Sequence, residues 1–216
     1  MRSRRRLPIE ELAPYLLPDH PRGVAGSPIV WPDLFGNANP VEIEVGFGKG
    51  LFLLNAGKSR PDINFFGVEI VRKCQLWTAT RVALDKLSNV KLACGDARPL
   101  LRDRIPENSV QAMHVYFPDP WWKKRHFKRR LFTDEFAAIV GKVLRPGGCF
   151  HIVTDVEEYF GVMMEIMQAL PIFEPTLAPK ATEAKNDLDY LTNFERKFRK
   201  EGRPIYRTAF AKANIT

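Results

Sequence analysis

Three acidic residues, Glu44, Glu69 and Asp96, stand at the ends of three successive apolar runs of the chain. Glycines follow the first of them at Gly46 and Gly48, where a ligand could approach the backbone because no side chain intervenes. If the runs are parallel strands, their carboxyl ends meet at one edge of a sheet, and the three acids line one crevice. Any one of them alone could equally be a solvated loop acid, but the three together are far more specific than the glycines.

The carboxylates indicate which cofactor the crevice could hold. Glu69 can accept hydrogen bonds from both hydroxyls of a ribose, and Asp96 can meet the amino group of adenine. Glu44 complements the amino group and sulfonium of S-adenosyl-L-methionine but would repel the pyrophosphate of a dinucleotide. Leu51 also stands where an NAD site would have its third glycine. We therefore predict S-adenosyl-L-methionine as the cofactor, contacted by Glu44, Gly46, Gly48, Glu69, Asp96 and Ala97.

A fourth acid, Asp119, lies in the segment Phe-Pro-Asp-Pro-Trp-Trp, which directly follows another apolar run. The two prolines fix φ and remove backbone donors, so this loop is expected to be stiff and to hold Asp119 in one direction. In a doubly wound sheet the fourth strand lies beside the first, which would place Asp119 near the glycines and the methyl acceptor. The rings of Trp121 and Trp122 could stack on a base, but packing against the body is the expected role of each alone.

Positive charge is concentrated in two segments of the chain. The 33 basic and 25 acidic residues give a net charge of +8. The arginines between Arg2 and Arg6 contribute four positive charges and the run Lys123 to Arg130 contributes six, which leaves −2 (8 − 10) on the rest. Because a local field attracts phosphate, and the second run adjoins the predicted chemistry, we expect a polyanionic substrate. A solvated charge run, a disordered arm or a nuclear localisation signal are the alternatives.

Alternating short apolar runs and helical segments place these residues in βαβ units, so the predicted fold class is α/β with a parallel sheet. A helix is expected after Thr133, with Lys142 and Arg145 in its last turn and Pro146 to Gly148 ending it. The least patterned segment, Pro171 to Asp189, is interpreted as a loop over the site. Strands are predicted at residues 41–45, 63–69, 90–94, 110–117, 149–154 and 205–211.

The composition fits one domain of 216 residues, with residues 1–40 as a basic N-terminal arm and lead-in and residues 41–216 as the catalytic domain. Three widely spaced cysteines, without a CxxC motif or neighbouring ligands, predict no metal site and a reducing, cytoplasmic setting. No secretory signal or membrane-spanning run is recognised, so no membrane partner is expected. The sequence leaves open whether the protein is a monomer or a homodimer.

The segment FPDPWWKKRHFKRR closely resembles the signature of the bacterial tRNA (guanine-N7)-methyltransferases. The resemblance extends from about Val41 to Tyr206, through EVGFGKG, GVE, GDA, VLRPGG, Asp155 and the segment TNFE followed by Gly202. It implies a Rossmann-like class I methyltransferase fold, with a mostly parallel seven-stranded sheet and helices on both faces. It also implies methyl transfer from S-adenosyl-L-methionine to N7 of a variable-loop guanine in tRNA.

The resemblance assigns roles to individual positions. Asp119 is the implied catalytic residue and a further cofactor contact. Because guanine N7 has no proton to lose, Asp119 is expected to act electrostatically, while Asp155 and Glu195 could read the guanine N1 and N2 donors. The implied substrate contacts are Lys123, Asp155, Thr192, Asn193, Phe194 and Glu195. The implied RNA contacts are Arg125, His126, Phe127, Lys128, Arg129 and Arg130.

Two alternative functions remain open from the sequence. A methyltransferase of the same fold could act on another RNA base, a protein or a small molecule. A non-catalytic RNA-binding module could have inherited the fold, although the intact acids Glu44, Glu69, Asp96 and Asp119 argue against it.

Overall fold

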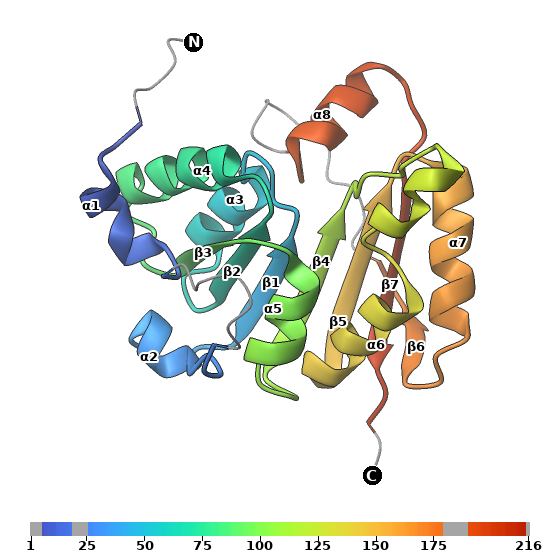
Figure 1. Ribbon diagram of the computed structural model, residues 1–216, viewed down its shortest axis with the longest axis horizontal. Coiled ribbons are helices and arrows are strands. Elements are labelled where there is room, and N and C mark those ends of the chain that lie inside the picture. Colours follow the sequence, from blue (N-terminus) through green and yellow to red (C-terminus); the bar gives the residue numbers. More distant parts are fainter. Residues whose placement is uncertain (1–5, 19–25, 179–189, 215–216) are drawn as a thin grey trace.

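The computed structural model describes residues 6–18, 26–178 and 190–214 and is built around a single seven-stranded sheet (Figure 1). The strand order is β3-β2-β1-β4-β5-β7-β6, which confirms the predicted Rossmann-like fold class. The strands are β1 (Val41–Val45), β2 (Asn64–Glu69), β3 (Val90–Cys94), β4 (Val110–Tyr116), β5 (Leu144–Thr154), β6 (Phe173–Thr176) and β7 (Tyr206–Lys212).

Successive strands are added on one side of β1 up to β3, and the chain then crosses to the other side of β1 to form β4. β1 pairs in parallel with both β2 and β4, so that Glu44 lies level with Gly67 on one side and His114 on the other. β5 continues the parallel part, whereas β7 runs antiparallel to both β5 and β6. The crevice between the carboxyl ends of β1 and β4 is therefore a topological switch point, where ligands bind in such sheets.

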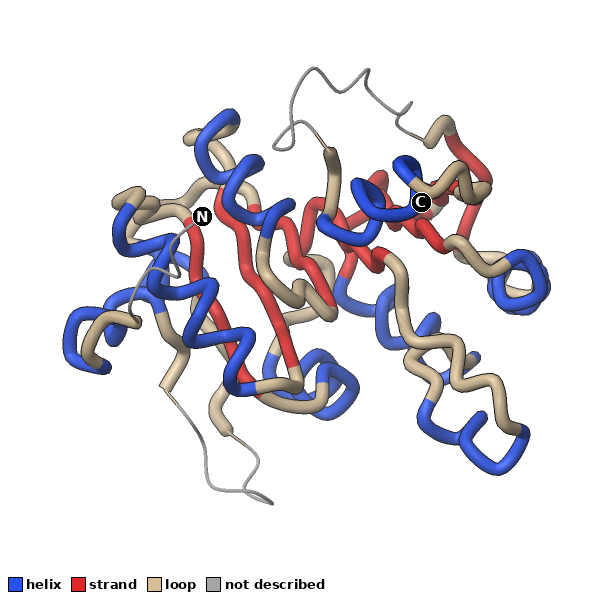
Figure 2. The backbone as a smooth tube through the Cα atoms, turned by 90° about the horizontal axis from the view of Figure 1, so that it is seen from above, coloured by secondary structure: helices blue, strands red, loops and turns tan. Residues whose placement is uncertain are grey.

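Helices cover both faces of the sheet (Figure 2). One core packs α5, α6 and α7 on one face, and the other packs α3, α4 and Phe198 of α8 on the opposite face. The helices are α1 (Ile9–Leu12), α2 (Trp31–Phe35), α3 (Leu51–Ser59), α4 (Arg72–Leu84), α5 (Ala97–Arg104), α6 (Asp134–Val143), α7 (Glu157–Gln168) and α8 (Asn193–Lys200), with 3-10 turns η1 (Ala13–Tyr15) and η2 (Lys124–Arg129). Leu12 and Trp31 are buried in these cores, so described residues of the lead-in pack on the sheet.

The helix expected after Thr133 is present but ends earlier than predicted. The Thr133 hydroxyl accepts a hydrogen bond from the Phe136 N–H and caps α6, as expected. Leu144 already pairs with Val110 in the sheet, and the next pair is Cys149 with Ala112. The prediction that Arg145 belongs to the last helical turn is therefore wrong, because residues 145–148 form a bulge within β5.

The segment Pro171 to Asp189 also differs from its prediction as a loop. It contains the strand β6, which forms an edge of the sheet beside β7. The four residues of β6 include Pro175, and only Phe173 is buried. The strand therefore lacks the alternation of apolar and polar residues by which a strand is recognised in a sequence. Residues 179–189 lie outside the described residues, as do Arg2, Arg4 and Arg5 of the basic arm.

Candidate active site

The carboxyl edge of the sheet contains two adjoining cavities of about 360 and 500 Å³. The first extends toward Glu69, Asp96 and Asp119, and the second toward Glu44 and α8. Both are lined by Gly46, Gly48, Cys74, Tyr116 and Phe194. We call the two cavities together the cleft.

The glycine loop forms the floor of the cleft with backbone that glycine adopts easily. Gly46 and Gly48 have φ values of 77° and 51°, in the left-handed region. A Cβ atom at either position would meet no protein atom within 4 Å, so the space beside both is open to a ligand. Gly50 is different, because a Cβ there would lie 2.2 Å from Cγ2 of Thr78.

Glu69 holds this loop in place. Its Oε2 accepts a hydrogen bond of 2.8 Å from the Gly48 N–H, and its Oε1 accepts one of 2.9 Å from the Val71 N–H. The carboxylate therefore ties the end of β2 to the glycine loop and lines the cleft. Each oxygen retains a second lone pair, which is compatible with the ribose contact predicted from the sequence.

Glu44 is buried without a hydrogen-bonding partner for one of its oxygens. Its side chain is 3% exposed, and no described residue hydrogen-bonds Oε2. Burial, together with the nearby charge of Glu69, raises the pKa of Glu44 well above its usual value. A buried polar atom without a partner is uncommon and costly, so a ligand that donates a hydrogen bond, best a cationic one, would stabilise this side chain.

Asp96 begins α5 at the far end of the cleft. It accepts a hydrogen bond of 3.0 Å from the Arg98 N–H, and its Oδ2 lies 2.8 Å from the Arg98 guanidinium. Burial raises its pKa, but the hydrogen bonds and charge of Arg98 outweigh that effect and lower it. Asp96 and its neighbour Ala97, two of the predicted cofactor contacts, both line the cleft.

The loop after β4 carries Asp119 on the opposite wall. Phe117 and Trp121 adopt φ values of 52° and 47°, which are strained for residues with side chains. The Phe117 N–H donates to the carbonyl of Val153, and the Arg130 Nε donates to the carbonyl of Pro120, so the loop is fixed at both ends. Asp119 is exposed and lines the cleft, across from the glycine loop.

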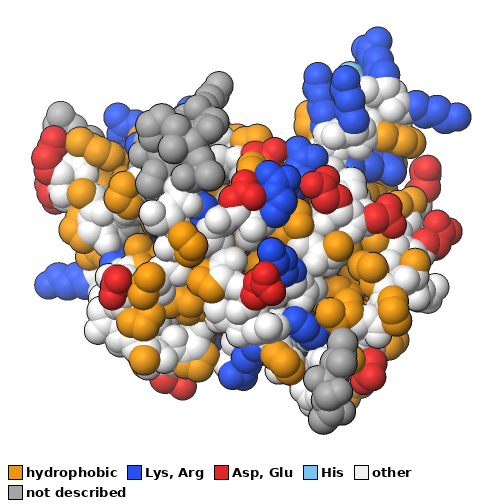
Figure 3. Space-filling view, turned by 60° about the horizontal axis from the view of Figure 1, so that its bottom comes forward, with side chains coloured by type: hydrophobic (Ala, Val, Ile, Leu, Met, Phe, Trp, Pro, Cys, Tyr) orange, Lys and Arg blue, Asp and Glu red, His pale blue; other side chains and the backbone are white. Residues whose placement is uncertain are grey.

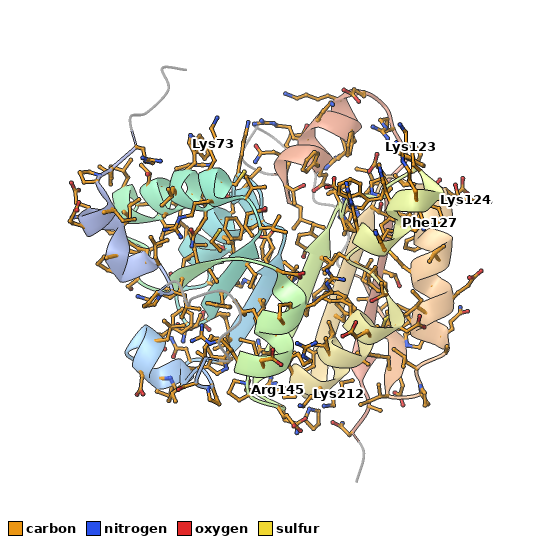
Figure 4. The ribbon with its side chains drawn as sticks, viewed as in Figure 1. Lys73, Lys123, Lys124, Phe127, Arg145 and Lys212 are labelled. Carbon is orange, nitrogen blue, oxygen red and sulfur yellow. The ribbon has the colours of Figure 1, made fainter. Side chains whose placement is uncertain are left out.

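The basic run forms a projection next to this wall. Figure 3 shows Lys and Arg side chains gathered on a protruding part of the surface, and Figure 4 places Lys124 and Phe127 at η2. Of the predicted RNA contacts, Arg125, Lys128 and Arg129 are exposed, whereas His126, Phe127 and Arg130 are half-buried. The guanidinium carbon of Arg130 lies 3.8 Å from the ring centre of Phe127 and 4.7 Å from that of Tyr159. Arg130 therefore anchors the projection to the body.

The two tryptophans, for each of which packing against the body was the expected role, have different surroundings. Trp121 lines the cleft, with Arg129 lying 5.1 Å over its ring and His126 meeting its ring edge-on. Trp122 is 64% exposed. The positive φ of Trp121 turns its ring toward the cleft, and this backbone strain is not visible in the sequence.

The segment Thr192 to Glu195 forms the start of α8 above the cleft. The Thr192 hydroxyl accepts from the Glu195 N–H, and Glu195 Oε2 accepts from the Leu191 N–H, which makes a reciprocal cap. Asn193 and the half-exposed Phe194 line the cleft with Thr192. Glu195 is only 2% exposed and forms an ion pair with Arg207.

Three of the predicted substrate contacts do not line the cleft. Glu195 faces a third cavity, Asp155 forms an ion pair with Arg203, and Lys123 lies at the base of the projection. The structure thus brings together the acids, the glycines and the first three residues of TNFE. Asp155 and Glu195 do not line the cleft, and the carboxylate of each is paired with an arginine.

A polar network next to the cleft was missed by the sequence analysis. His114 Nε2 lies 2.9 Å from Glu42 Oε2, and His114 Nδ1 lies 2.8 Å from the hydroxyl of Tyr116. Tyr116 lines both the cleft and a third cavity of about 450 Å³. The sequence signal was a polar residue at every second position of two buried strands, Glu42 with Glu44 and His114 with Tyr116.

The described residues include neither a metal-binding cluster nor a helix that could cross a membrane. No three of their His, Cys, Asp and Glu side chains gather in a way that could hold a metal ion. None of the helices in that part of the chain has the length and apolar character needed to cross a membrane.

Comparisons with known proteins agree with this architecture. Residues 38–208 match a family model described as "Putative methyltransferase". A tRNA (guanine-N(7)-)-methyltransferase of Rhodopirellula baltica is 44% identical over 185 residues, covering 83% of this chain and 68% of that protein. One from Geobacter metallireducens is 35% identical over 199 residues, covering 92% of each.

Solved structures resemble the fold at low sequence identity. The 16S rRNA methyltransferase KamB has a TM-score of 0.61 at 14% identity and covers 85% of this chain and 92% of its own. TrmN from Thermus thermophilus has a TM-score of 0.58 at 18% identity and covers 81% of this chain and 45% of its own. These likenesses establish the class I methyltransferase fold.

Proposed function

The chain belongs to the family of tRNA (guanine-N(7)-)-methyltransferases, and we propose that its cleft binds S-adenosylmethionine and presents the methyl group to N7 of a variable-loop guanine in tRNA. A cytoplasmic location is part of this proposal, because tRNA is the substrate. The remaining proposals concern which residues hold the cofactor and which meet the RNA.

The unpartnered Oε2 of Glu44 is the observation that carries the cofactor proposal. A cationic amino group would supply the hydrogen bonds and the charge that this buried carboxylate lacks. Glu69 ends β2 and Asp96 follows β3, and both line the cleft, where they can accept hydrogen bonds from a ribose and an adenine. The acids of the cleft thus fit a positively charged nucleoside better than a phosphorylated one.

Methylation of guanine at N7 requires alignment and charge stabilisation rather than proton transfer. N7 carries a lone pair and no proton, so no general base is needed. S-adenosylmethionine, when bound, supplies a methyl group on a positively charged sulfur. As N7 accepts the methyl group, positive charge develops on the purine, and the Asp119 carboxylate stabilises it from a loop that is already rigid.

For the tRNA substrate, we propose residues that contact the guanine, residues that position them, and cations that bind the phosphates. Thr192, Asn193 and Phe194 contact the guanine, because they line the cleft at the start of α8 and Phe194 offers a half-exposed ring for stacking. Asp155 and Glu195 act as positioning residues, since each carboxylate already binds an arginine. Lys123 and the exposed cations of η2 bind the tRNA phosphates.

The test is methyl transfer to unmodified tRNA followed by nucleoside analysis. Wild-type protein should produce 7-methylguanosine, and Asp119→Asn should lower kcat/KM by about 100-fold or more, as for other residues that stabilise developing charge. Asp62→Asn, an exposed acid before β2, is the matched control and should retain activity. Near wild-type turnover by Asp119→Asn would contradict the catalytic assignment.

Other outcomes of the same assay decide between the alternatives. A different methylated nucleoside would indicate a same-fold enzyme acting on another base. If calorimetric titration detected no binding of S-adenosylmethionine, the chain would instead be a non-catalytic RNA-binding module.

A further inference from the structure

Helix α4 carries a basic and aromatic stripe that the proposed function does not use. Lys73, Trp77 and Arg81 are spaced by four residues and so lie along one face of the helix. Lys73 is exposed, Trp77 is 39% exposed, and the guanidinium carbon of Arg81 lies 5.2 Å over the Trp77 ring. We call these three residues the α4 stripe. The helix has three cations, Arg72 among them, and no acidic residue.

The α4 stripe begins beside the cleft, on the side opposite the projection formed by η2. Cys74, the neighbour of Lys73, lines both cavities of the cleft. Figure 4 shows Lys73 at the same edge of the molecule as Lys123 and Lys124, and Arg145 at the opposite edge. Exposed cations therefore flank the cleft on both sides.

The chemistry of the α4 stripe matches that of η2. In η2 a guanidinium, that of Arg129, lies 5.1 Å over Trp121, and in α4 the same pair of residue types recurs at 5.2 Å. A planar guanidinium carries five N–H donors in a fork that matches a phosphate, and it can stack on an indole ring at the same time. The Arg81 Nη1 also donates a hydrogen bond of 3.4 Å to the carbonyl of Lys49. Bases and riboses can also stack on exposed aromatic surface.

Neither the helix dipole nor an ion pair with a described residue stabilises the positive charge of Lys73 at its position in α4. Lys73 lies in the first turn of α4, where the helix dipole disfavours a cation. None of the ion pairs or hydrogen bonds formed within the described part of the chain involves its ammonium group. An anionic ligand would compensate for this placement.

We propose that the α4 stripe is a second phosphate-binding surface for tRNA, so that the RNA backbone spans the cleft from η2 to α4. This rests on the proposed function, since it names where the same substrate is held. With phosphates bound on both sides, the target guanine enters the cleft between two fixed points of the backbone. A one-sided surface would position the base less firmly.

The experiment compares two double variants with the same change in net charge. Lys73→Gln/Arg81→Gln removes two charges from the α4 stripe. Lys142→Gln/Arg145→Gln removes two other exposed charges, and Figure 4 shows Arg145 at the opposite edge. Binding of unmodified tRNA is measured by fluorescence anisotropy over a range of salt concentrations. Two lost phosphate contacts should reduce the slope of log Kobs against log salt by about 1.5, and the control pair should leave it unchanged.

Two further measurements keep the outcomes distinct. The affinity for S-adenosylmethionine, measured by calorimetry, should not change in Lys73→Gln/Arg81→Gln. Trp77→Ala should weaken tRNA binding several-fold without changing the salt slope, because stacking is not ionic. If the wild type methylates tRNA and both double variants keep its slope, the inference for α4 is overturned. If the wild type neither binds nor methylates tRNA, it is the proposed function that fails.

Discussion

Two glutamates of β1 differ in their hydrogen-bonding partners and therefore in their pKa values. Glu42 and Glu44 lie two positions apart and point to the same face of the sheet, and both are buried. Burial raises the pKa of Glu42, but the hydrogen bond and charge of His114 and the charge of Arg60 outweigh it and lower the pKa to about 2. Glu44 has neither kind of partner, and its pKa is raised. Glu42 has all its partners within the fold, whereas Glu44 keeps an oxygen without a partner, as expected of a residue that binds the proposed cofactor.

This difference predicts opposite effects for the same substitution at the two positions. Glu44→Gln should raise the stability of the free protein by about 1 kcal/mol, because a buried carboxyl near Glu69 is removed. It should also weaken S-adenosylmethionine binding by about 10- to 100-fold, since a charged hydrogen bond is lost. Urea unfolding and calorimetric titration measure the two effects.

Glu42→Gln is the matched control. It should destabilise the fold, because Arg60 and His114 lose their anionic partner, and it should leave cofactor affinity nearly unchanged. A Glu44→Gln protein that binds S-adenosylmethionine as tightly as the wild type would exclude Glu44 from the cofactor site.

At the scale of elements, the loop after β4 and the projection η2 are coupled through Arg130. This arginine donates to the Pro120 carbonyl next to Asp119 and also stacks on Phe127 and Tyr159. The rigid loop and the projection, for which we propose RNA binding, therefore share one anchor. Lys128 lies in the same projection, but its side chain is exposed.

Removing one charge from each position should separate anchoring from RNA binding. Lys128→Gln should reduce the salt slope of tRNA binding by about 0.7–0.9, as expected for one phosphate contact. Arg130→Gln should change that slope little but lower kcat by roughly 10-fold or more, because Asp119 loses its fixed position. Single-turnover kinetics at saturating tRNA measure the second effect. Equal salt slopes and equal rates for the two variants would argue against a separate anchoring role.

At the scale of the whole molecule, the sheet joins the cleft to a buried cluster on the same face. The rings of His114 and His151 stack at 4.9 Å between their centres, and Tyr116 links His114 to the wall of the cleft. Burial lowers the pKa of both histidines, that of His151 to about 4. The cluster is therefore neutral at its histidines near pH 7.

Acid should weaken the fold through this cluster. Between pH 6.5, the ordinary pKa of His, and about 4, unfolded His151 binds a proton that the folded state excludes. Stability is thus lost as the pH falls through this window, by at most about 3 kcal/mol from His151. Glu42 contributes further loss in the same direction, as the pH falls from its ordinary value of 4.5 toward about 2.

Urea unfolding at a series of pH values measures this loss. His151→Gln should flatten the decline between pH 6.5 and 4, whereas His126→Gln, outside the cluster, should follow the wild-type curve. An equally steep decline in His151→Gln would show that another group causes the acid sensitivity.

The sequence alone determined the local features of this protein. The acids at strand ends, the glycine loop, the stiff loop around Asp119, the helix cap at Thr133 and the fold class could all be predicted, because they depend on residue type and short-range spacing. The bulge at residues 145–148 and the edge strand β6 could not, since strand pairing rather than local propensity decides them.

Only the tertiary structure decided which polar groups are already satisfied. Glu195 and Asp155 resemble free recognition groups in the sequence, yet each binds an arginine from another part of the chain. Arg130, predicted as an RNA contact, also donates to the Pro120 carbonyl and so holds the loop that carries Asp119. Glu44, by contrast, is left with an unpartnered oxygen beside the cleft. The physical reason is that hydrogen bonds and burial depend on residues distant in the sequence, so polar groups with and without partners become distinguishable only once the chain is folded.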